Sequence, residues 1–509
     1  MSPGDNNRGD QHAGDQHAGD QDWKPHLDEL ERRRAAARAM GGPERLDRLM
    51  TQRGKLDARK RLELLFDPGS FSELGALVGG VRIPADALVA GFGRVAGRPL
   101  LAAAEDFSVL GGSIGSGSMN KRYRICQLAL QERVPLVFML DGAGHRLTDT
   151  GGGGRAPNDL LALADCRGNV PMLCLVLGAS AGHGALTSPL SDFTIMSAAA
   201  SMFTGGPPLV KAALGEDVSK EELGGAAVCT EAGTVHNVEP DDASAIALAR
   251  RYLGYFPQSR FETPERREGP DAGPRRLDGI LELIPPDDRK PYRMRRVLEL
   301  LVDGGEFLEV QPGYGKSLIT ALAHLGGRPV AILANDPWVR GGAVDSAAAI
   351  KACDFIETAA CFHLPLLFLA DNPGVLAGTK AEREGILKWG GKMFLAQRRA
   401  RVPKLHVTLR KSFGFGSTTM AQNPFDAQTL TLALPSVTMG AMPAASGGAS
   451  AKLDSDTQAE VEAAQQSGPW AMAGGMTYDD VIDPRELRNA LLAGLDLCEA
   501  RLGRADARD

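Results

Sequence analysis

The segment Pro135-Leu-Val-Phe-Met-Leu-Asp141 recurs in the second half of the chain as Pro365-Leu-Leu-Phe-Leu-Ala-Asp371. Each copy is a short apolar run that ends on an aspartate and leads into a glycine-containing stretch. This pattern is typical of a buried strand followed by a tight turn. One such run is common in α/β proteins, so the informative feature is whether its neighbours recur at the same spacing.

The repetition extends beyond this segment in both directions. Gly97-Arg-Pro-Leu100 returns as Gly327-Arg-Pro-Val330, at the same spacing as the first pair of segments. After a small drift in register, Pro171 to Gly184 aligns with Pro403 to Gly416. Two unrelated domains that share only glycine-rich turns would not keep one register over this length. The sequence therefore predicts an α/β fold built by tandem duplication of one unit, with crossover connections between its strands.

The two units are expected to be joined by a proline-rich connector. Residues 257–291 hold seven prolines and many charges, which is typical of an exposed linker. We expect a first domain over residues 23–262, a linker over 263–290 and a second domain over 291–509. Residues 1–22 are rich in Gly, Asp, Asn and Gln, and they predict a disordered tail because they have nothing to pack into a core.

Apolar runs and amphipathic periodicity predict the elements inside each unit. The helices expected near the N-terminus are Leu27–Met40 and Lys55–Phe66. The expected buried strands are Leu136–Leu140, Leu173–Leu177, Leu366–Leu369 and Leu405–Leu409.

Composition excludes several classes of function. With 43% hydrophobic residues in 509, the chain can bury large cores. The net charge of −6 with interspersed basic residues argues against a nucleic-acid partner. No apolar run approaches the roughly 18 residues of a membrane span, so we expect no membrane association and a cytoplasmic location. The seven cysteines include no Cys-x-x-Cys pair, and we expect no metal site.

Two glycine-rich loops in each unit are the candidate sites. They cover residues 141–146 and 178–185 in the first unit, and 371–378 and 413–417 in the second. Each loop follows a predicted strand and precedes a predicted helix, so free N–H groups can point at an anionic oxygen. Glycine allows the backbone to come close to that oxygen. A pair of such loops predicts an oxyanion hole suited to a thioester enolate.

A structural explanation for these loops is also open. The glycines could only pack helices against strands, or they could bind phosphate. The loops match neither the Walker pattern nor a dinucleotide fingerprint with its acidic residue. Recurrence of the loops in both units favours a functional role.

Several motifs, taken in order, carry a family resemblance. They are Glu105-Asp-Phe-Ser-Val-Leu-Gly-Gly-Ser113, Met202-Phe-Thr-Gly-Gly-Pro207, Gly215-Glu-Asp-Val-Ser-Lys-Glu-Glu-Leu-Gly-Gly225 and Tyr478-Asp-Asp-Val-Ile-Asp-Pro-Arg485. From about residue 24 to 500, the chain resembles the β (carboxyltransferase) subunit of biotin-dependent acyl-CoA carboxylases, the propionyl-CoA carboxylase-like group. The resemblance implies two crotonase-like domains and a homo-oligomer, a hexamer in that family. It also implies active sites between the N-terminal domain of one copy and the C-terminal domain of another.

The resemblance implies an activity and its partners. A carboxyltransferase subunit moves CO₂ from carboxybiotin to the α-carbon of an acyl-CoA through enolates held in two oxyanion holes. The biotin is expected on a separate carrier that belongs to a biotin carboxylase and biotin carboxyl carrier subunit, and a CoA thioester is the substrate. Two alternatives are open: a biotin-independent acyl-CoA decarboxylase or another crotonase-type enolate enzyme, and a non-catalytic scaffold subunit.

Site residues follow from the resemblance by motif position. The amides expected to hold the acyl thioester are those of Ala143, Gly144, Gly182 and His183; those expected to hold the biotin ureido oxygen are Val375, Gly414, Phe415 and Gly416. Further substrate-binding residues are expected to be Gly111, Gly112, Lys121, His145, Arg146 and Gly374.

The individual side chains carry more specific expectations. Lys121 is expected to meet the CoA phosphates or to form a surface ion pair. Arg146 is expected either to hold a carboxylate or to position its loop. The imidazoles of His145 and His183 either contact the substrate, with a possible acid role, or simply pack their loops.

Two loops depart from the family pattern. Gly142-Ala-Gly-His-Arg146 stands where the family has Ser-Gly-Gly-Ala-Arg, and Phe413-Gly-Phe-Gly416 stands where it has Tyr-Gly-Gly-Ala. Only the backbone of Phe415 is needed for a donor role, so we expect its bulky side chain to turn away from the biotin ring.

Overall fold

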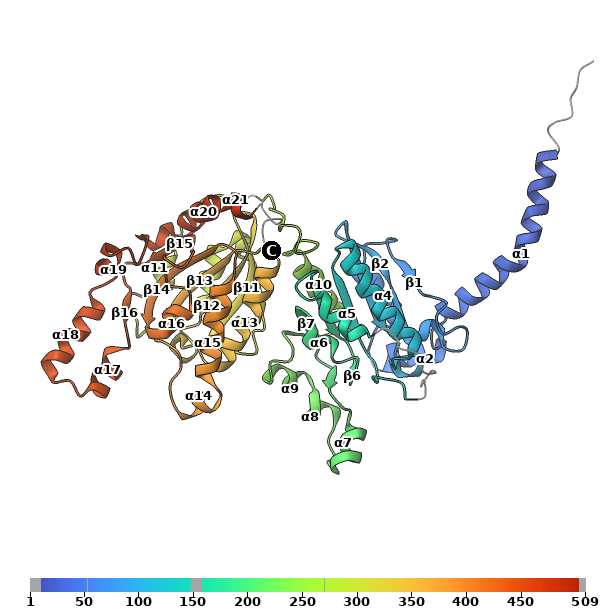
Figure 1. The fold of residues 1–509 in the computed structure, drawn as a ribbon, viewed down its shortest axis with the longest axis horizontal. Helices are drawn as coiled ribbons and strands as arrows, with labels where there is room; N and C mark the ends of the chain where they lie inside the picture. Colours follow the sequence, from blue (N-terminus) through green and yellow to red (C-terminus); the bar gives the residue numbers. More distant parts are fainter. Residues whose placement is uncertain (1–10, 53, 148–157, 270, 503–509) are drawn as a thin grey trace, which may run out of the picture.

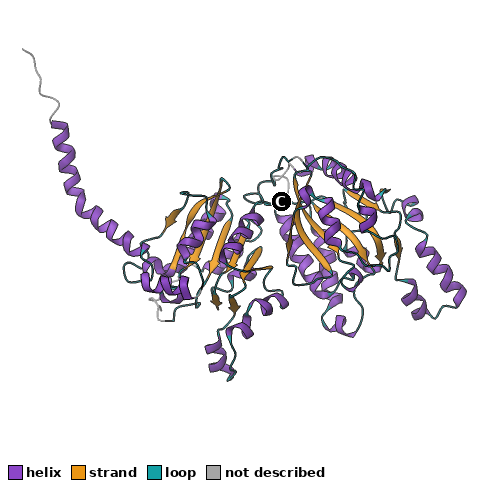
Figure 2. Ribbon diagram, turned by 180° about the vertical axis from the view of Figure 1, so that it is seen from behind, coloured by secondary structure: helices purple, strands orange, loops and turns teal. Residues whose placement is uncertain are grey.

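The computed structural model describes residues 11–52, 54–147, 158–269 and 271–502. Two units lie side by side, each a mixed β-sheet with helices packed against it (Figures 1 and 2). Helix α1 extends away from the first unit at one end of the molecule, and helices α17 and α18 project from the second unit at the other end (Figure 1).

The first sheet has the strand order β1-β2-β3-β4-β5-β7-β9. Its first three strands are antiparallel, and the pairs from β3 onward are parallel. The strands are β1 (Ser72–Leu74), β2 (Leu88–Val95), β3 (Arg98–Glu105), β4 (Leu136–Leu140), β5 (Met172–Val176), β7 (Phe193–Ser197) and β9 (Asn237–Glu239), with β6 (Ala179–Ala181) and β8 (Ser201–Phe203) forming a separate ribbon.

The second sheet repeats this plan in the order β10-β11-β12-β13-β14-β15-β17, with β16 added beside β14. The register repeats as well, because Leu101 pairs with Leu136 in the first sheet and Ala331 with Leu366 at the equivalent place in the second. The predicted duplication is confirmed. The strands are β10 (Phe307–Val310), β11 (Leu318–Leu325), β12 (Arg328–Asn335), β13 (Leu366–Asn372), β14 (Lys404–Phe413), β15 (Leu430–Ala433), β16 (Thr438–Gly440) and β17 (Asp480–Val481).

The helices follow the strands in both units. In the first unit they are α1 (Gln11–Arg38), α2 (Pro43–Asp47), α3 (Ala58–Leu65), α4 (Ser116–Glu132), α5 (Asp159–Cys166), α6 (Thr187–Leu190), α7 (Pro207–Leu214), α8 (Lys220–Gly224), α9 (Ala226–Glu231) and α10 (Asp242–Leu253). In the linker and second unit they are α11 (Ile280–Leu283), α12 (Met294–Leu301), α13 (Ser346–Cys361), α14 (Thr379–Arg383), α15 (Ile386–Arg399), α16 (Gly414–Thr419), α17 (Ala444–Ala451), α18 (Ser455–Gln466), α19 (Trp470–Gly474), α20 (Leu487–Leu497) and α21 (Glu499–Leu502).

The predicted tail is wrong in part. Residues 11–22, which we expected to be disordered, form the first turns of α1, and the rest of the tail lies outside the described residues. Alanine and glutamine, which recur in this stretch, favour a helix once one is started. The helix predicted over Leu27–Met40 belongs to α1, and the one predicted over Lys55–Phe66 is α3, whose N-cap Asp57 accepts from the amide of Lys60.

One hydrophobic cluster spans the two units, in addition to a separate core in each. Buried residues of both sheets belong to the same cluster, which includes Phe193 and Tyr252 of the first unit and Phe355 and Phe362 of the second. The rings of Phe256 and Phe362 meet edge to face with centroids 5.6 Å apart. The contact between the units therefore fixes their relative position by apolar packing.

The linker is less exposed than we expected. Leu277 and Ile280 are fully buried in the core of the second unit. Nη1 of the buried Arg410 donates to the carbonyl oxygens of Pro285, Asp287 and Lys290. Buried peptide carbonyls require such donors, so this part of the linker is a fixed component of the second unit. The domain boundaries themselves stay predictions.

Membrane association was not expected from the sequence. Within the described residues, the structure has no helix with the length and apolar character that crossing a bilayer requires.

Candidate active site: two pairs of glycine-rich loops

The two loops of the first unit come into backbone contact. Gly144 has a φ of +83°, and a Cβ placed on it would lie 2.6 Å from the carbonyl oxygen of Ala181. The amide of Ala181 donates to the carbonyl of Gly142 at 3.2 Å. Both the positive φ and the close approach require glycine at position 144. Residues 141–146 and 178–185 therefore form one surface, as we expected.

The two loops of the second unit meet in the same way. A Cβ on Gly416 would lie 2.6 Å from Cα of Gly374, whose own φ is +122°. Helix α16 begins at Gly414 without a side-chain cap. The first N–H groups of a helix have no acceptor inside it, so the amides of Gly414, Phe415 and Gly416 all lie at an uncapped helix start.

A single bridge shows which amide of the first loop points outward. His145 pairs in parallel with Ile114. Ile114 donates to the carbonyl of Gly144 and accepts from the amide of Arg146, both at 2.8 Å. In such a bridge the neighbours of His145 make the bonds, so its own N–H faces the opposite side.

The second unit has a bridge at the equivalent place in the repeat. Val375 pairs in parallel with Val344. Val344 donates to the carbonyl of Gly374 at 3.2 Å and accepts from the amide of Leu376 at 2.8 Å. The N–H of Val375 therefore points outward, and its counterpart in the first unit is His145.

Two of the predicted amide donors serve the fold instead. The amide of Ala143 donates to the carbonyl of Gly111 at 3.0 Å, and the amide of Gly182 donates to that of Phe203 at 3.1 Å. Within the described residues, the amides of His145 and His183 have no backbone acceptor. The prediction that Ala143 and Gly182 donate to a thioester is therefore corrected, because both amides are bonded to backbone carbonyls.

The internal repeat contained the signal for this correction. His145 corresponds to Val375 at the spacing that aligns the central strands. His183 corresponds to Phe415 within the aligned segments 171–184 and 403–416. The resemblance led us to assign His145 a side-chain role only. Its amide would have been found by applying the repeat spacing to Val375.

Gly111 and Gly112, which we expected to bind substrate, hold the loops together. Gly111 supplies the carbonyl that accepts from Ala143. A Cβ on Gly112 would lie 2.3 Å from the carbonyl oxygen of Asp141, and one on Gly342 would lie 2.2 Å from that of Asp371. These glycines allow the close approach of the loop that follows β4 or β13.

Lys121 does not lie where it could meet the CoA phosphates. Its side chain is buried, and Nζ donates to the carbonyl oxygens of Ala85 and Leu88. Burial lowers the pKa of Lys121 to about 8. Lys351 occupies the same position in α13, with Nζ donating to two carbonyls, and burial lowers its pKa to about 7. Both lysines satisfy buried peptide groups, so the predicted role of Lys121 is wrong.

Arg146 is buried and holds its own loop. Nη1 lies 2.7 Å from Oδ1 of Asp86, and Nη2 donates to the carbonyl of Ser113 at 2.8 Å. Nε donates to Oγ of Ser113 at 3.2 Å. Of the two roles that the sequence left open, these contacts support positioning of the loop.

A hydrogen-bonded series of polar and charged side chains lies beside the first pair of loops. Nε2 of His183 is 2.7 Å from Oδ1 of Asp159, and Nε of Arg122 donates to Oδ2 of Asp159 at 2.6 Å. Arg122 and Asp159 are fully buried, whereas His183 keeps 20% of its side-chain surface exposed. The ring of His145 lies 6.4 Å from that of His183.

Glu105 lies directly beneath the same loops. Its Oε2 accepts from the amide of Asp141 at 2.8 Å. A Cβ on Gly184 would lie 3.1 Å from Oε1. Burial raises the pKa of Glu105 to about 7, although the charge of Arg122 opposes that shift. In the second unit Asn335 takes this place, accepting from the amide of Asp371 and donating to the carbonyl of Gly342.

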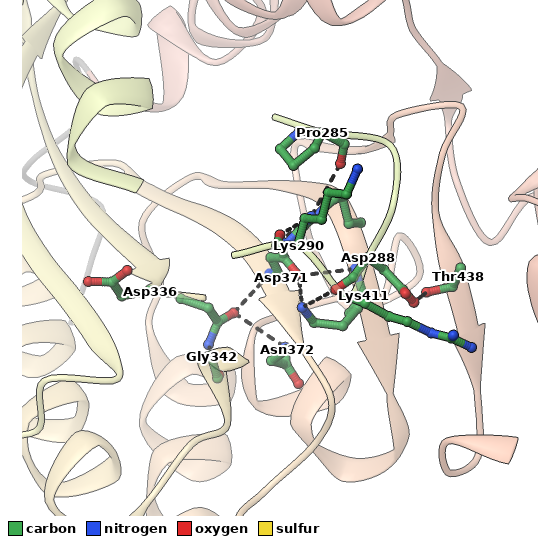
Figure 3. Close-up of polar contacts among 12 residues, drawn as sticks. Pro285, Asp288, Lys290, Asp336, Gly342, Asp371, Asn372, Lys411 and Thr438 are labelled. Atoms are coloured by element: carbon green, nitrogen blue, oxygen red, sulfur yellow. Dashed lines mark hydrogen bonds and ion pairs between the residues drawn. The ribbon is translucent and has the colours of Figure 1, made fainter. Parts of the chain in front are cut away.

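A buried aspartate follows the central strand in each unit. Asp141 lies 3.0 Å from both Lys55 and Arg61. Asp371 lies 2.8 Å from Arg410 and 3.0 Å from Lys411, which points at its carboxylate (Figure 3). Buried carboxylates need such paired cations. These aspartates therefore anchor the starts of the two loops.

The side chain of Phe415 lies against α15. Its ring is 5.9 Å from that of Phe394, and a Cβ on Gly390 would lie 3.6 Å from it. The ring is 40% exposed. The side chain thus packs on a neighbouring helix, while its amide is at the start of α16.

Comparison with known proteins identifies a matching family and several of its members. The carboxyl transferase domain family matches residues 50–502. The methylmalonyl-CoA carboxyltransferase 12S subunit of Propionibacterium freudenreichii subsp. shermanii is 34% identical over 502 residues, or 92% of this chain and 94% of that protein. The mitochondrial propionyl-CoA carboxylase beta chain of Homo sapiens is 32% identical over 500 residues, or 93% of this chain and 91% of that protein.

A solved structure shares the whole fold. The crystal structure of transcarboxylase 12S with methylmalonyl-coenzyme A and methylmalonic acid bound superimposes with a TM-score of 0.86 at 33% identity. The match covers 93% of this chain and 96% of that one, and the structure is described as a hexamer assembly.

Proposed function

The chain belongs to the carboxyl transferase domain family, and from this premise we propose that it is the acyl-CoA carboxyltransferase subunit of a biotin-dependent carboxylase. Its two halves are crotonase-like domains. The observation that carries the proposal is the pair of outward amides in each half: His145 and His183 in the first, Val375 and Phe415 in the second. Losing one donor of such a pair costs about 10² to 10³ in rate.

The first pair suits the acyl thioester. Its oxygen accepts from the amides of His145 and His183, and negative charge gathers on that oxygen when the α-proton leaves. Asp141, Arg146 and Glu105 hold the two loops in place, so the donors need no rearrangement during the reaction.

The second pair suits the ureido oxygen of biotin. An uncapped helix start offers donors only, which matches a carbonyl-type oxygen that accepts two hydrogen bonds. When bound, carboxylated biotin supplies the carboxyl group. The packing of the Phe415 ring on α15 leaves its amide available for this contact.

The partners are part of the proposal. We propose that biotin arrives on a separate carrier, within a biotin carboxylase and biotin carboxyl carrier subunit, and that copies of this chain form a homo-oligomer, a hexamer. The hexamer of the transcarboxylase relative supports this, as do the exposed apolar side chains Leu387, Phe425 and Trp470, which another copy could bury. The proposal includes a cytoplasmic location, which fractionation of cells that express the chain would test.

Incubation of the purified chain with carboxylated biotin carrier and a panel of acyl-CoAs tests the activity, with products followed by mass spectrometry. Carboxylated CoA product is the expected result and ranks the substrates. Decarboxylation of malonyl- or methylmalonyl-CoA by the chain alone, without transfer, would instead favour a biotin-independent decarboxylase. If the chain bound no acyl-CoA, the result would favour the role of a non-catalytic scaffold subunit.

A further inference from the structure

The side chain of His183 is held by a buried ion pair, although only the backbone amide of this residue belongs to the proposed hole. Nε2 of the ring lies 2.7 Å from Oδ1 of Asp159, the first residue of α5. Nε of Arg122 donates to Oδ2 of the same carboxylate at 2.6 Å. Asp159 and Arg122 are fully buried, so water does not compete for these contacts. His183 therefore combines an outward amide with an anchored side chain.

The direction of the hydrogen bond between His183 and Asp159 does not depend on the charge of the imidazole. Burial raises the pKa of Asp159, but the hydrogen bond from His183 and the charge of Arg122 outweigh burial and hold that pKa below its ordinary value. Asp159 is therefore a carboxylate, which only accepts hydrogen bonds. Nε2 of His183 donates to it whether the ring is neutral or protonated. The contact thus anchors the ring in both states.

Arg122 also holds the end of the loop that carries His183. Its Nη2 donates at 2.6 Å to Oγ1 of Thr187, the first residue of α6. The amide of Thr187 donates in turn to the carbonyl of Gly184 at 3.1 Å. Among the residues that the structure describes, the amide of His183, just before Gly184, has no backbone acceptor. The loop is therefore fixed by its side chains on either side of an amide that stays available.

The second half anchors the corresponding residue by a different kind of contact. Phe415 stands at the position of His183, and its ring lies 5.9 Å from that of Phe394 in α15. Ala352 stands at the position of Arg122. In both halves the residue with the outward amide has its side chain tied to a neighbouring helix, through a carboxylate in the first and through ring packing in the second. The recurrence indicates a common need, which is a fixed direction for the amide.

We propose that Asp159 and Arg122 are positioning residues for the first hole. Through the ring of His183, they hold the backbone amide of that residue toward the thioester oxygen of the acyl-CoA. The imidazole is an anchor and takes no part in proton transfer. Donors that are fixed before charge develops need no rearrangement when the enolate forms. This inference rests on the proposed function, because it takes an acyl thioester as the ligand of the first hole.

Two substitutions of His183 separate an anchor from ring chemistry, with carboxyl transfer from carboxylated biotin carrier to propionyl-CoA as the reaction. His183→Ala keeps the amide and removes the contact with Asp159. It is expected to lower kcat/KM for propionyl-CoA about 10²-fold, the effect of a displacement of roughly 1 Å. His183→Gln restores an N–H donor but has no basic ring nitrogen, and it is expected to recover about tenfold or more of that loss. The KM for the carboxylated carrier, which engages the second hole, should stay within about twofold in both variants.

A double-mutant cycle tests Asp159. Asp159→Asn is expected to lower kcat/KM for propionyl-CoA at least as much as His183→Ala does. Because both act through one contact, the double variant should lie within about threefold of Asp159→Asn alone. Asp165→Asn is the matched control, since it makes the same charge change on an exposed position of α5, and it should keep the wild-type kcat/KM. If Asp159→Asn does not fold, the His183 variants still decide the question, because that side chain keeps 20% of its surface exposed.

The possible outcomes distinguish this inference from the proposed function. Wild-type kcat/KM in His183→Ala would overturn the inference. So would a His183→Gln variant that is no better than His183→Ala, or losses that simply multiply in the double variant. In each of these cases carboxyl transfer by the wild-type chain would leave the proposed function standing. A wild-type chain that binds no propionyl-CoA in calorimetry and carboxylates no acyl-CoA would overturn both.

Discussion

The two halves keep the same backbone at the loops but place different side chains beneath and beside it. The bridges at His145 and Val375 occupy equivalent places in the repeat. In both halves the two loops come into contact at a glycine. The first half surrounds its loops with Glu105, Arg122 and Asp159. The second has Asn335 and Ala352 at the places of Glu105 and Arg122, and Phe415 at the place of His183. The duplication thus preserved the outward amides, which depend on chain direction, while the side chains around them diverged.

The largest expected difference concerns the buried aspartates. Asp371→Asn leaves the fully buried Arg410 without a carboxylate, and breaking such a pair costs about 3–5 kcal/mol. Asp141→Asn is expected to cost less, because Arg61 keeps Asp242 at 2.8 Å. Urea unfolding of both variants measures the difference. Equal losses would show that the two anchors are energetically equivalent.

Glycine substitutions should separate the two holes. Gly144→Ala forces a Cβ against the carbonyl of Ala181, and Gly416→Ala forces one against Gly374. We expect each to lower carboxyl transfer about 10² to 10³-fold by misplacing a donor. Only Gly144→Ala should also raise the KM for propionyl-CoA.

Gly391→Ala is the control for these variants, because nothing lies within 4 Å of its added Cβ and it sits inside α15. It should leave carboxyl transfer and the KM for propionyl-CoA unchanged. If Gly416→Ala raised the KM for propionyl-CoA as much as Gly144→Ala does, the two holes would not be separate sites.

Glu105 should give the first half a pH dependence that Asn335 does not give the second. Burial raises the folded-state pKa of Glu105 to about 7, against roughly 4.3 in an unfolded chain. The folded state therefore retains a proton that the unfolded chain releases. Stability is fully present below the unfolded pKa and is lost as the pH rises through the folded pKa.

Glu105→Gln cannot ionise and should lose less stability between pH 4.5 and 8 than the wild type, by on the order of 3 kcal/mol. Urea unfolding across that pH range measures the difference. Burial also raises the pKa of Asp192 to about 7, but this group is common to both proteins and cancels. Parallel pH profiles for variant and wild type would contradict the prediction.

The smallest effect is expected from truncation of Phe415. Phe415→Ala keeps the amide at the start of α16 and removes a ring that is 40% exposed. We expect a stability change within about 1 kcal/mol and a kcat for carboxyl transfer within about threefold. The KM for the carboxyl donor is expected to change more than kcat. A tenfold fall in kcat would show that the ring itself contributes to the reaction.

Much of the fold was predictable from sequence because it rests on local patterns. The strand predicted over Leu136–Leu140 has the bounds of β4, and the prediction over Leu173–Leu177 is displaced by one residue from β5. Apolar runs of this length identify buried strands whatever their neighbours are. The helix over residues 11–22 was missed because composition alone does not exclude a helix.

The sequence by itself determined the duplication, the positions of the four loops and the family. It could not determine which amides are free. Along a bridged segment the N–H direction alternates with each residue, so the outward amide could be identified as that of His145 only once Ile114 was in place. The burial of Lys121, the contact of Arg410 with the linker, and the pairing of His183 with Asp159, 24 residues away, depend equally on the folded chain. Contacts of this kind are decided by tertiary packing, because segments distant in sequence must meet before a side chain acquires a partner.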